Sequence, residues 1–130
     1  MASAPPLGTP RLRLLPFSER HLTEKYLSWL NDPETVRFSE QRFRRHTLES
    51  CRTYRQSFET SPDDFWAIER AAPDAEHLGN ITALPNSNHG TAELGILIGK
   101  NSQGQGYATE AWLGICDFLF RPQNVRKISA

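Results

Sequence analysis

The 130-residue sequence predicts an α+β (α/β) fold in which a mixed, mostly antiparallel sheet is flanked by helices. Apolar residues recur at helical spacing in three segments, 22–30, 48–58 and 107–120. By contrast, residues 65–98 contain successive short apolar runs that are typical of strands. Turn-forming residues at 86–90 separate two of these runs and favour a hairpin, which would make the strands antiparallel.

The amino-terminal half is expected to contain one strand and two helices. Residues 1–10 are small and proline-rich, which suggests a flexible leader, and the alternating residues 11–14 predict a half-buried strand. Ser18 is placed to cap a helix that ends near Asn31, because the proline two positions later disfavours helical geometry in the residue before it. Thr47 is the expected cap of the second helix.

The carboxy-terminal half is expected to contain strands around one long helix. Strands are predicted at residues 65–69, 78–84 and 92–98, and a helix over residues 107–120 follows them. Residues 125–130 begin a further strand. An apolar strand left uncovered at a sheet edge invites pairing with another chain, so self-association through this edge is an expected interaction.

Composition excludes several classes of partner. Lys plus Arg and Asp plus Glu both number 15, so the formal charge gives no general attraction to nucleic acid or to an anionic membrane. No apolar run approaches the length of a membrane span. Cys51 and Cys116 are far apart, lack metal-ligand spacing and fall on the apolar side of predicted helices. We therefore expect buried reduced thiols, no metal site and a cytoplasmic protein.

The stretch over residues 93–111 carries the strongest functional signal. Gly104 and Gly106 lie where an apolar strand gives way to an amphipathic helix. Glycines allow positive φ and a close approach of ligand to the main chain. A helix start leaves backbone N–H groups without partners, and its dipole favours negative charge. The combination predicts a binding site for a phosphate-type anion.

A family resemblance centres on the same loop. The residues concerned are Gln103-Gly104-Gln105-Gly106-Tyr107-Ala108. They resemble the Q/R-x-x-G-x-G/A signature of the GNAT superfamily of acyl-CoA N-acyltransferases, and the similarity extends to residues 92–95, 109–111 and 29–33. The combination looks most like the branch of ribosomal-protein N-terminal and amino-sugar acetyltransferases. The resemblance implies a GNAT-like fold over residues 11–130 that lacks the family's last helix and strands, as in a fragment or a domain completed in trans.

The resemblance also implies an acetyl-CoA site. The amides from Gln103 to Thr109 would hold the pyrophosphate, and the pantetheine arm would lie between the strand before the loop and the next parallel strand. A main-chain N–H of Leu97 or Ile98 would bind the thioester oxygen and stabilise the oxyanion. The residues expected to bind this co-substrate are Ile96, Leu97, Ile98, Gln103, Gly104, Gln105, Gly106, Tyr107, Ala108 and Thr109.

Candidates for proton transfer and acceptor binding are less specific. Glu93 is the best candidate for a general base, although a solvated carboxylate at a strand end is an alternative interpretation. His89 is a weaker candidate for moving a proton. Arg42, Arg44 and Arg45 could receive an acidic acceptor, or could belong to a solvated charged loop.

The leading hypothesis is an N-acetyltransferase in which a primary amine, on a small molecule or a peptide, directly attacks acetyl-CoA. One alternative is a non-catalytic CoA-binding or interaction fragment, because the acceptor-site half of the family domain is missing. Another is a dinucleotide-binding unit, but Thr109 occupies the position of the third glycine in that motif.

Overall fold

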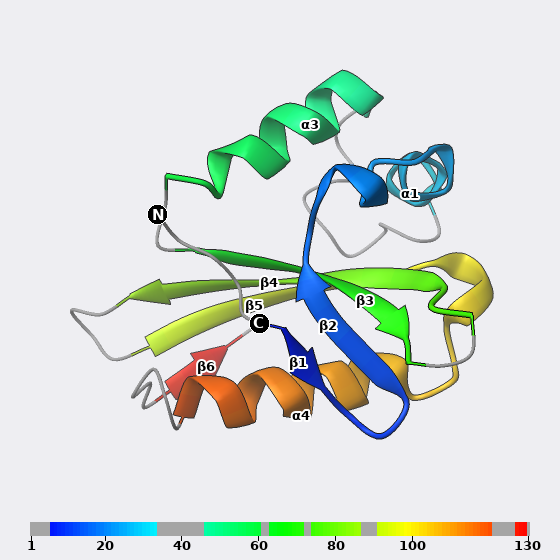
Figure 1. Ribbon diagram of the computed structural model, residues 1–130. Coiled ribbons are helices and arrows are strands. Elements are labelled where there is room, and N and C mark those ends of the chain that lie inside the picture. The colour runs from blue at the N-terminus through cyan, green and yellow to red at the C-terminus, as the bar shows by residue number, and fades with distance from the viewer. Residues whose placement is uncertain are drawn as a thin grey trace.

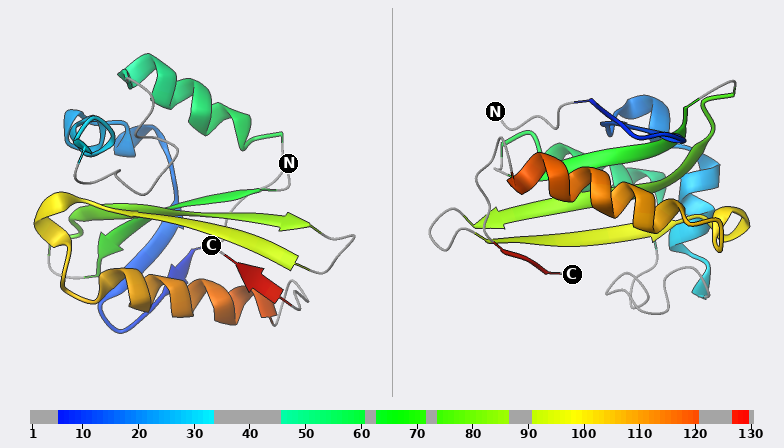
Figure 2. Two further views of the ribbon diagram at one scale, coloured as in Figure 1. Left: turned by 180° about the vertical axis from the view of Figure 1, so that it is seen from behind. Right: turned by 90° about the horizontal axis from the view of Figure 1, so that it is seen from below.

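A six-stranded sheet forms the centre of the computed structural model, with helices on both faces (Figure 1). The described residues are 6–33, 46–60, 63–71, 74–86, 91–120 and 127–129. The strands are β1 (Leu7–Gly8), β2 (Leu12–Pro16), β3 (Asp64–Arg70), β4 (His77–Asn86), β5 (Thr91–Ile98) and β6 (Lys127–Ser129). The helices are α1 (Glu24–Leu30), α3 (Leu48–Ser57) and α4 (Tyr107–Phe120). Helix α4 covers one face of the sheet, and α1 and α3 cover the other (Figure 2).

The strands lie in the sheet in their order along the chain. Strands β1 to β5 each pair antiparallel with the next, whereas β6 pairs parallel with β5. The longest ladder joins β4 and β5, from Gly79 opposite Ile98 to Asn86 opposite Thr91. The predicted mixed, mostly antiparallel sheet with flanking helices is therefore confirmed.

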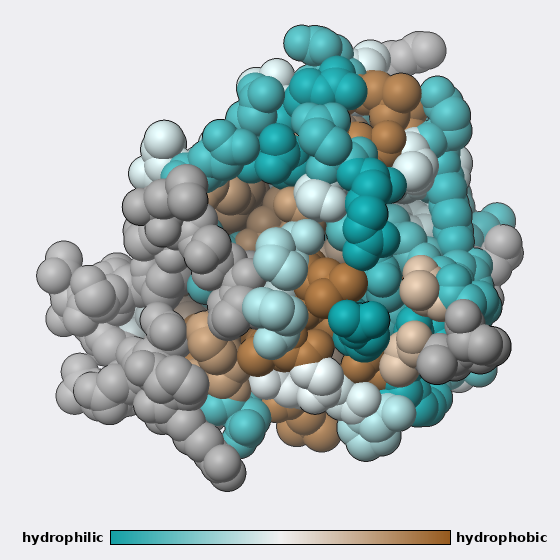
Figure 3. All heavy atoms as spheres, in the orientation of Figure 1, coloured by the Kyte–Doolittle hydropathy of each residue, from teal (hydrophilic) through white to brown (hydrophobic). Residues whose placement is uncertain are grey.

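Two apolar clusters hold the layers together. The cluster on the α4 face includes Leu14, Trp66 and Ile115, and the cluster under α1 and α3 includes Phe17 and Phe65. Successive residues of a strand point to opposite faces, so the unbroken buried run of β3 supplies both clusters. Hydrophobic residues reach the surface in small groups among hydrophilic ones in the view of Figure 3.

The observed N-cap matches the predicted one at α3 but differs from it at α1. The Thr47 hydroxyl accepts from Ser50 N (3.0 Å) at the start of α3, as predicted. Ser18 instead precedes a short 3-10 helix, Glu19–His21, and Thr23 caps α1. The expectation that Ser18 caps α1 is wrong because His21 Nδ1 accepts from Ser18 N (3.0 Å), which closes a separate turn.

The expected leader is also partly ordered. Leu7 and Gly8 pair with Leu14 and Arg13, and Thr9 N donates to Leu12 O (2.9 Å), so a short hairpin forms there. Residues 1–10 are therefore not a flexible leader throughout, because the backbone groups of β1 find partners on β2. No helix among the described residues is long and apolar enough to cross a membrane.

Candidate active site

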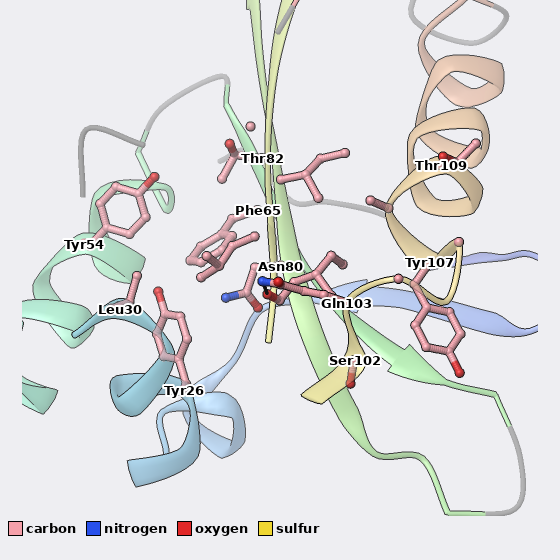
Figure 4. A pocket seen from close by; sticks show the side chains of 17 residues that line it. Tyr26, Leu30, Tyr54, Phe65, Asn80, Thr82, Ser102, Gln103, Tyr107 and Thr109 are labelled. Atoms are coloured by element: carbon pink, nitrogen blue, oxygen red, sulfur yellow. Dashed lines mark hydrogen bonds between the residues drawn. The ribbon is translucent and has the colours of Figure 1, made fainter. Parts of the chain in front are cut away.

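A cavity of about 590 Å³ opens between α1 and α3 on one side and β5 and the start of α4 on the other (Figure 4). Tyr26, Tyr54 and Phe65 form an aromatic wall at one end. Asn80 and Thr82 of β4 line its middle, and β5 with the loop before α4 forms the rest. The cavity thus joins an aromatic end to the glycine loop singled out by the sequence.

One edge of β5 is free over the part that lines the cavity. Among the described residues, β6 pairs only with the first three residues of β5, Thr91 to Glu93. The cavity is lined by Gly95 to Ile98, which lie beyond the last of these pairs. Main-chain groups that point away from β4 in this segment are therefore available to a ligand.

The register of β4 and β5 decides which groups those are. Gly99 N donates to Leu78 O (2.9 Å), and hydrogen-bonded pairs alternate with non-bonded pairs along an antiparallel ladder. Two residues before Gly99, Leu97 is therefore in a hydrogen-bonded pair with β4. Ile98 and Ile96 are in the non-bonded pairs, so their N–H and C=O groups point to the free edge. Gln103 Nε2 donates to Ile98 O (3.0 Å), in agreement with that direction. Of the two predicted oxyanion donors, the register thus turns Leu97 N–H away from the free edge.

The glycine loop leads into a helix start whose first amides are unpaired. Gly104 and Gly106 have φ of 79° and 80°, in the left-handed region that glycine favours. The first backbone bond of α4 joins Glu110 N to Gly106 O (3.1 Å), so the N–H groups of residues 107–109 have no acceptor within the helix.

A cluster of polar contacts supports this loop from outside the cavity. The Glu110 carboxylate accepts from Thr9 Oγ1 (2.5 Å), Arg11 N (2.8 Å) and Arg11 Nε (2.6 Å). Arg11 Nη1 donates to Gln105 O (2.9 Å), and the guanidinium lies 4.7 Å from the centre of the Tyr107 ring. Burial would raise the pKa of Glu110, but the bonds from Thr9 and Arg11 bring it below its ordinary value.

Tyr107 belongs to this outer support rather than to the reacting end of the cavity. Its ring points away from Asn80 in Figure 4. The Arg11 guanidinium lies over this ring, 4.7 Å from its centre. Tyr107 is thereby engaged in structure and is poorly placed to donate a proton to a leaving group.

The middle of the cavity contains a polar side chain that the sequence analysis did not single out. Asn80 is 4% exposed, and its Oδ1 accepts from His77 Nε2 (2.8 Å) while its Nδ2 has no partner among the described residues. Burial lowers the pKa of His77 to about 4, so its ring is neutral at pH 7. Burial also raises the pKa of Tyr26, which keeps that hydroxyl protonated. The signal in the sequence was the polar pair Asn80 and Thr82 at alternate positions of an otherwise apolar strand.

A second buried polar group lies behind this wall. Glu69 Oε2 is 2.7 Å from His21 Nε2 and 2.6 Å from Arg20 Nη2, and both Glu69 and His21 are 2% exposed. Because His21 Nδ1 accepts from Ser18 N, the ring proton lies on Nε2 and is donated to Glu69. Burial lowers the pKa of His21, consistent with this neutral form. These groups do not line the cavity, so they stabilise the fold around it.

Comparison with known proteins agrees with this geometry. The acetyltransferase (GNAT) domain family matches residues 11–130. The chain belongs to this GNAT family. No curated protein matches the sequence. The family match includes the β5 edge, the glycine loop and α4, so the cavity lies within the GNAT domain.

Solved acetyltransferases share the GNAT fold of this chain. A GNAT-family acetyltransferase from Bacillus anthracis aligns with a TM-score of 0.80 and 16% identity, over 95% of this chain and 71% of that chain. The ribosomal L7/L12 alpha-N-protein acetyltransferase, in complex with coenzyme A, aligns with a TM-score of 0.74 and 14% identity, over 95% and 72% of the two chains. The Vibrio cholerae spermidine N-acetyltransferase, in complex with CoA and spermine, aligns with a TM-score of 0.74 and 20% identity, over 91% of this chain and 69% of that chain. Against another acetyltransferase, 25% identical with a TM-score of 0.75, the match covers 98% of this GNAT chain but 65% of that chain.

The remaining predicted site residues of this GNAT domain lie outside the cavity or outside the described residues. Glu93 is exposed on β5 and does not line the cavity, although it shares a strand face with Gly95, which does. Arg42, Arg44, Arg45 and His89 lie outside the described residues. Among those described, no three His, Cys, Asp or Glu side chains are grouped so as to hold a metal ion.

Proposed function

We propose that this GNAT domain transfers an acetyl group from acetyl-CoA to a primary amine by direct attack. The observation that carries the proposal is the group of unpaired amides at residues 107–109, at the start of α4 and next to the free edge of β5. A hydrogen bond to a charged group contributes about 1.5–3 kcal/mol, whereas an exposed helix dipole contributes about 0.3–1 kcal/mol. Several loop amides acting on the pyrophosphate therefore outweigh the dipole, and the geometry that the two glycines permit matters most.

The free edge of β5 supports a matching path for the pantetheine arm. An arm that leaves the loop along this edge meets Ile98 first and Ile96 second, since both direct main-chain groups outwards. Ile98 N–H is then placed to bind the arm, and Ile96 N–H, farther from the loop, to bind the thioester oxygen. A donor at that oxygen stabilises the negative charge that develops as the amine attacks. The proposed oxyanion donor is therefore Ile96 N–H and not Leu97 N–H.

The acceptor amine must reach the thioester carbon in its neutral form. An α-amine with a pKa of about 7.7–8.0 is roughly one-tenth neutral at pH 7, whereas a lysine amine with a pKa near 10.4 is far less so. Glu93 lies on the face of β5 that borders the cavity and could accept the proton through a water molecule. The attacking nitrogen forms the amide bond, the carbon–sulfur bond breaks, and the sulfur leaves as a thiolate that takes up a proton. We therefore favour an α-amine or an amine of similar basicity as the acceptor.

Two measurements test the proposal in order. Calorimetry with acetyl-CoA, CoA and a nicotinamide dinucleotide should show binding of the first two and none of the third. Thiol release from acetyl-CoA in the presence of an amine panel should then show transfer. Absence of CoA binding would refute the proposed site itself.

A non-catalytic CoA-binding module is the second candidate. It is favoured by the position of Glu93 outside the cavity lining. This alternative predicts CoA binding without thiol release for any amine in the panel.

A further inference from the structure

We infer that Arg11 and Glu110 form a clamp that sets the direction of the amides in the glycine loop. The clamp comprises the side chains of Arg11 and Glu110 together with the Gln105 carbonyl that Arg11 holds. Arg11 is therefore a positioning residue that acts on the pyrophosphate through the loop. The inference rests on the proposed acetyl-CoA site and adds a residue that lies outside its cavity lining.

The peptide bond between Gln105 and Gly106 is planar, which fixes the directions of its two polar groups. In a trans peptide, the carbonyl and the N–H that follows it point in opposite directions. Arg11 Nη1 holds the Gln105 carbonyl on the outer side at 2.9 Å, so Gly106 N–H points to the opposite side. Gly106 lines the cavity and Gln105 does not, which agrees with this orientation. Without the clamp, this peptide could rotate, because glycine tolerates many backbone conformations.

Glu110 holds Arg11 in place. Its carboxylate accepts from both the main chain and Nε of Arg11, and from Thr9 Oγ1 on the same hairpin. The carboxylate lies in the first turn of α4, so the clamp fixes the β1–β2 hairpin, the loop and the helix start relative to one another. A β-carbon at Gly106 would lie 3.3 Å from Arg11 Nη2, so the guanidinium also packs closely against the loop.

A simple charge effect makes the opposite prediction for one variant. If only net charge near the loop mattered, then Glu110→Gln would remove a negative charge and strengthen binding of an anionic ligand. If the clamp matters, the same change weakens binding, because the amide group cannot accept all three bonds as the carboxylate does. The sign of the change in affinity therefore distinguishes the two explanations.

The experiment compares four variants by calorimetry with CoA. Arg11→Gln and Glu110→Gln should each raise the Kd about tenfold, and Arg11→Lys should recover little, since an ammonium lacks the forked geometry that reaches two acceptors. Arg13→Gln is the matched control: Arg13 lies on β2 and is exposed, its side chain makes no hydrogen bond or ion pair with the described residues, and its loss changes the charge equally. Its Kd should stay within twofold of the parent value. Circular dichroism and thermal unfolding identify any variant that has lost its fold.

A second substrate separates positioning of the loop from general damage. S-acetylpantetheine lacks the pyrophosphate, so the clamp variants should change its KM and kcat by less than twofold while raising the KM for acetyl-CoA about tenfold. Tighter or unchanged CoA binding by Glu110→Gln would overturn the clamp. So would equal losses with both thioesters, or an equal loss in Arg13→Gln. If the parent protein fails to bind CoA, the proposed function fails with the clamp, whereas a failure of the clamp alone leaves CoA binding by the parent intact.

Discussion

Gly104 and Gly106 share a backbone conformation but differ in what surrounds them. Both have positive φ, which is unfavourable for a residue with a β-carbon. A β-carbon at Gly104 would meet nothing within 4 Å, whereas one at Gly106 would lie 3.3 Å from Arg11 Nη2. Substitution of Gly106 is thus opposed both by its positive φ and by the nearby Arg11 side chain, whereas substitution of Gly104 is opposed by its positive φ alone.

Gly106→Val should weaken acetyl-CoA binding at least tenfold while preserving the helical signal. The added side chain strains the loop and displaces Arg11, but α4 retains its hydrogen bonds. Calorimetry measures the affinity and far-UV circular dichroism the helix content. Gly104→Ala, which adds about 1–2 kcal/mol of conformational strain without a clash, should have the smaller effect. Unchanged affinity in Gly106→Val would contradict the role of this loop.

His77 should make stability depend on pH. Its pKa is lowered by burial to about 4 in the folded protein, so below pH 6.5 the unfolded chain binds a proton that the folded chain does not. The free energy of unfolding should therefore fall between about pH 6.5 and 4, by about 2 kcal/mol at pH 5. Above pH 6.5 this contribution does not change with pH.

Urea unfolding of the parent and of His77→Gln at pH 7.5 and 5 measures this effect. Glutamine cannot titrate but can still donate to Asn80 Oδ1, so the variant should lose less stability on acidification. Any pH dependence that remains in the variant reports the other buried groups, including His21. Identical pH dependence in the two proteins would refute the assignment to His77.

At the scale of the element, the β4–β5 ladder is what holds the free edge of β5 in place. A β-carbon on Gly79 would lie 2.2 Å from the Leu97 carbonyl oxygen, which is main chain and cannot rotate away. Glycine is therefore required at this point of β4, where the two strands lie closest to the loop.

Gly79→Ala should destabilise the protein by about 1–3 kcal/mol, because relief of the clash requires the two strands to separate. It should also weaken CoA binding, since Ile98 lies directly opposite Gly79 in the register. Gly8→Ala is the control, since a β-carbon there would meet nothing within 4 Å. Urea unfolding and calorimetry check both effects, and equal stability of the two variants would contradict the close approach.

At the scale of the whole molecule, the cavity joins elements from most of the chain. Its lining comes from both helices on one face, three strands, the glycine loop and the start of α4. A ligand that fills it would bind the folded state and not the unfolded chain, so its binding energy adds to the stability of the whole domain.

CoA at 100 times its Kd should raise the free energy of unfolding by about 2.7 kcal/mol, which corresponds to roughly 10 °C in Tm for a domain of this size. Differential scanning fluorimetry over a range of CoA concentrations measures the shift. A nicotinamide dinucleotide at the same concentrations should leave Tm unchanged. No shift with CoA would indicate that the cavity does not take this ligand.

The sequence alone determined those features that depend on neighbours in the chain. The three long helices, the antiparallel strands and the glycine loop follow from periodicity, capping residues and turn chemistry, which act within a few residues. The start of α1 was missed because a histidine three residues after Ser18 closed a separate turn. The signature around Gly106 located the loop because its backbone conformation is a local property.

Which groups face the cavity depends on strand register and on packing between distant segments. Whether Leu97 or Ile98 offers its amide depends on the register with β4, and that Asn80 lines the cavity depends on the packing of α1 against the sheet. The contact of Arg11 with Glu110 joins residues 99 positions apart, and no periodic pattern reports such a pair. Local forces set the elements, whereas long-range pairing and burial set the directions of the groups that a ligand would meet.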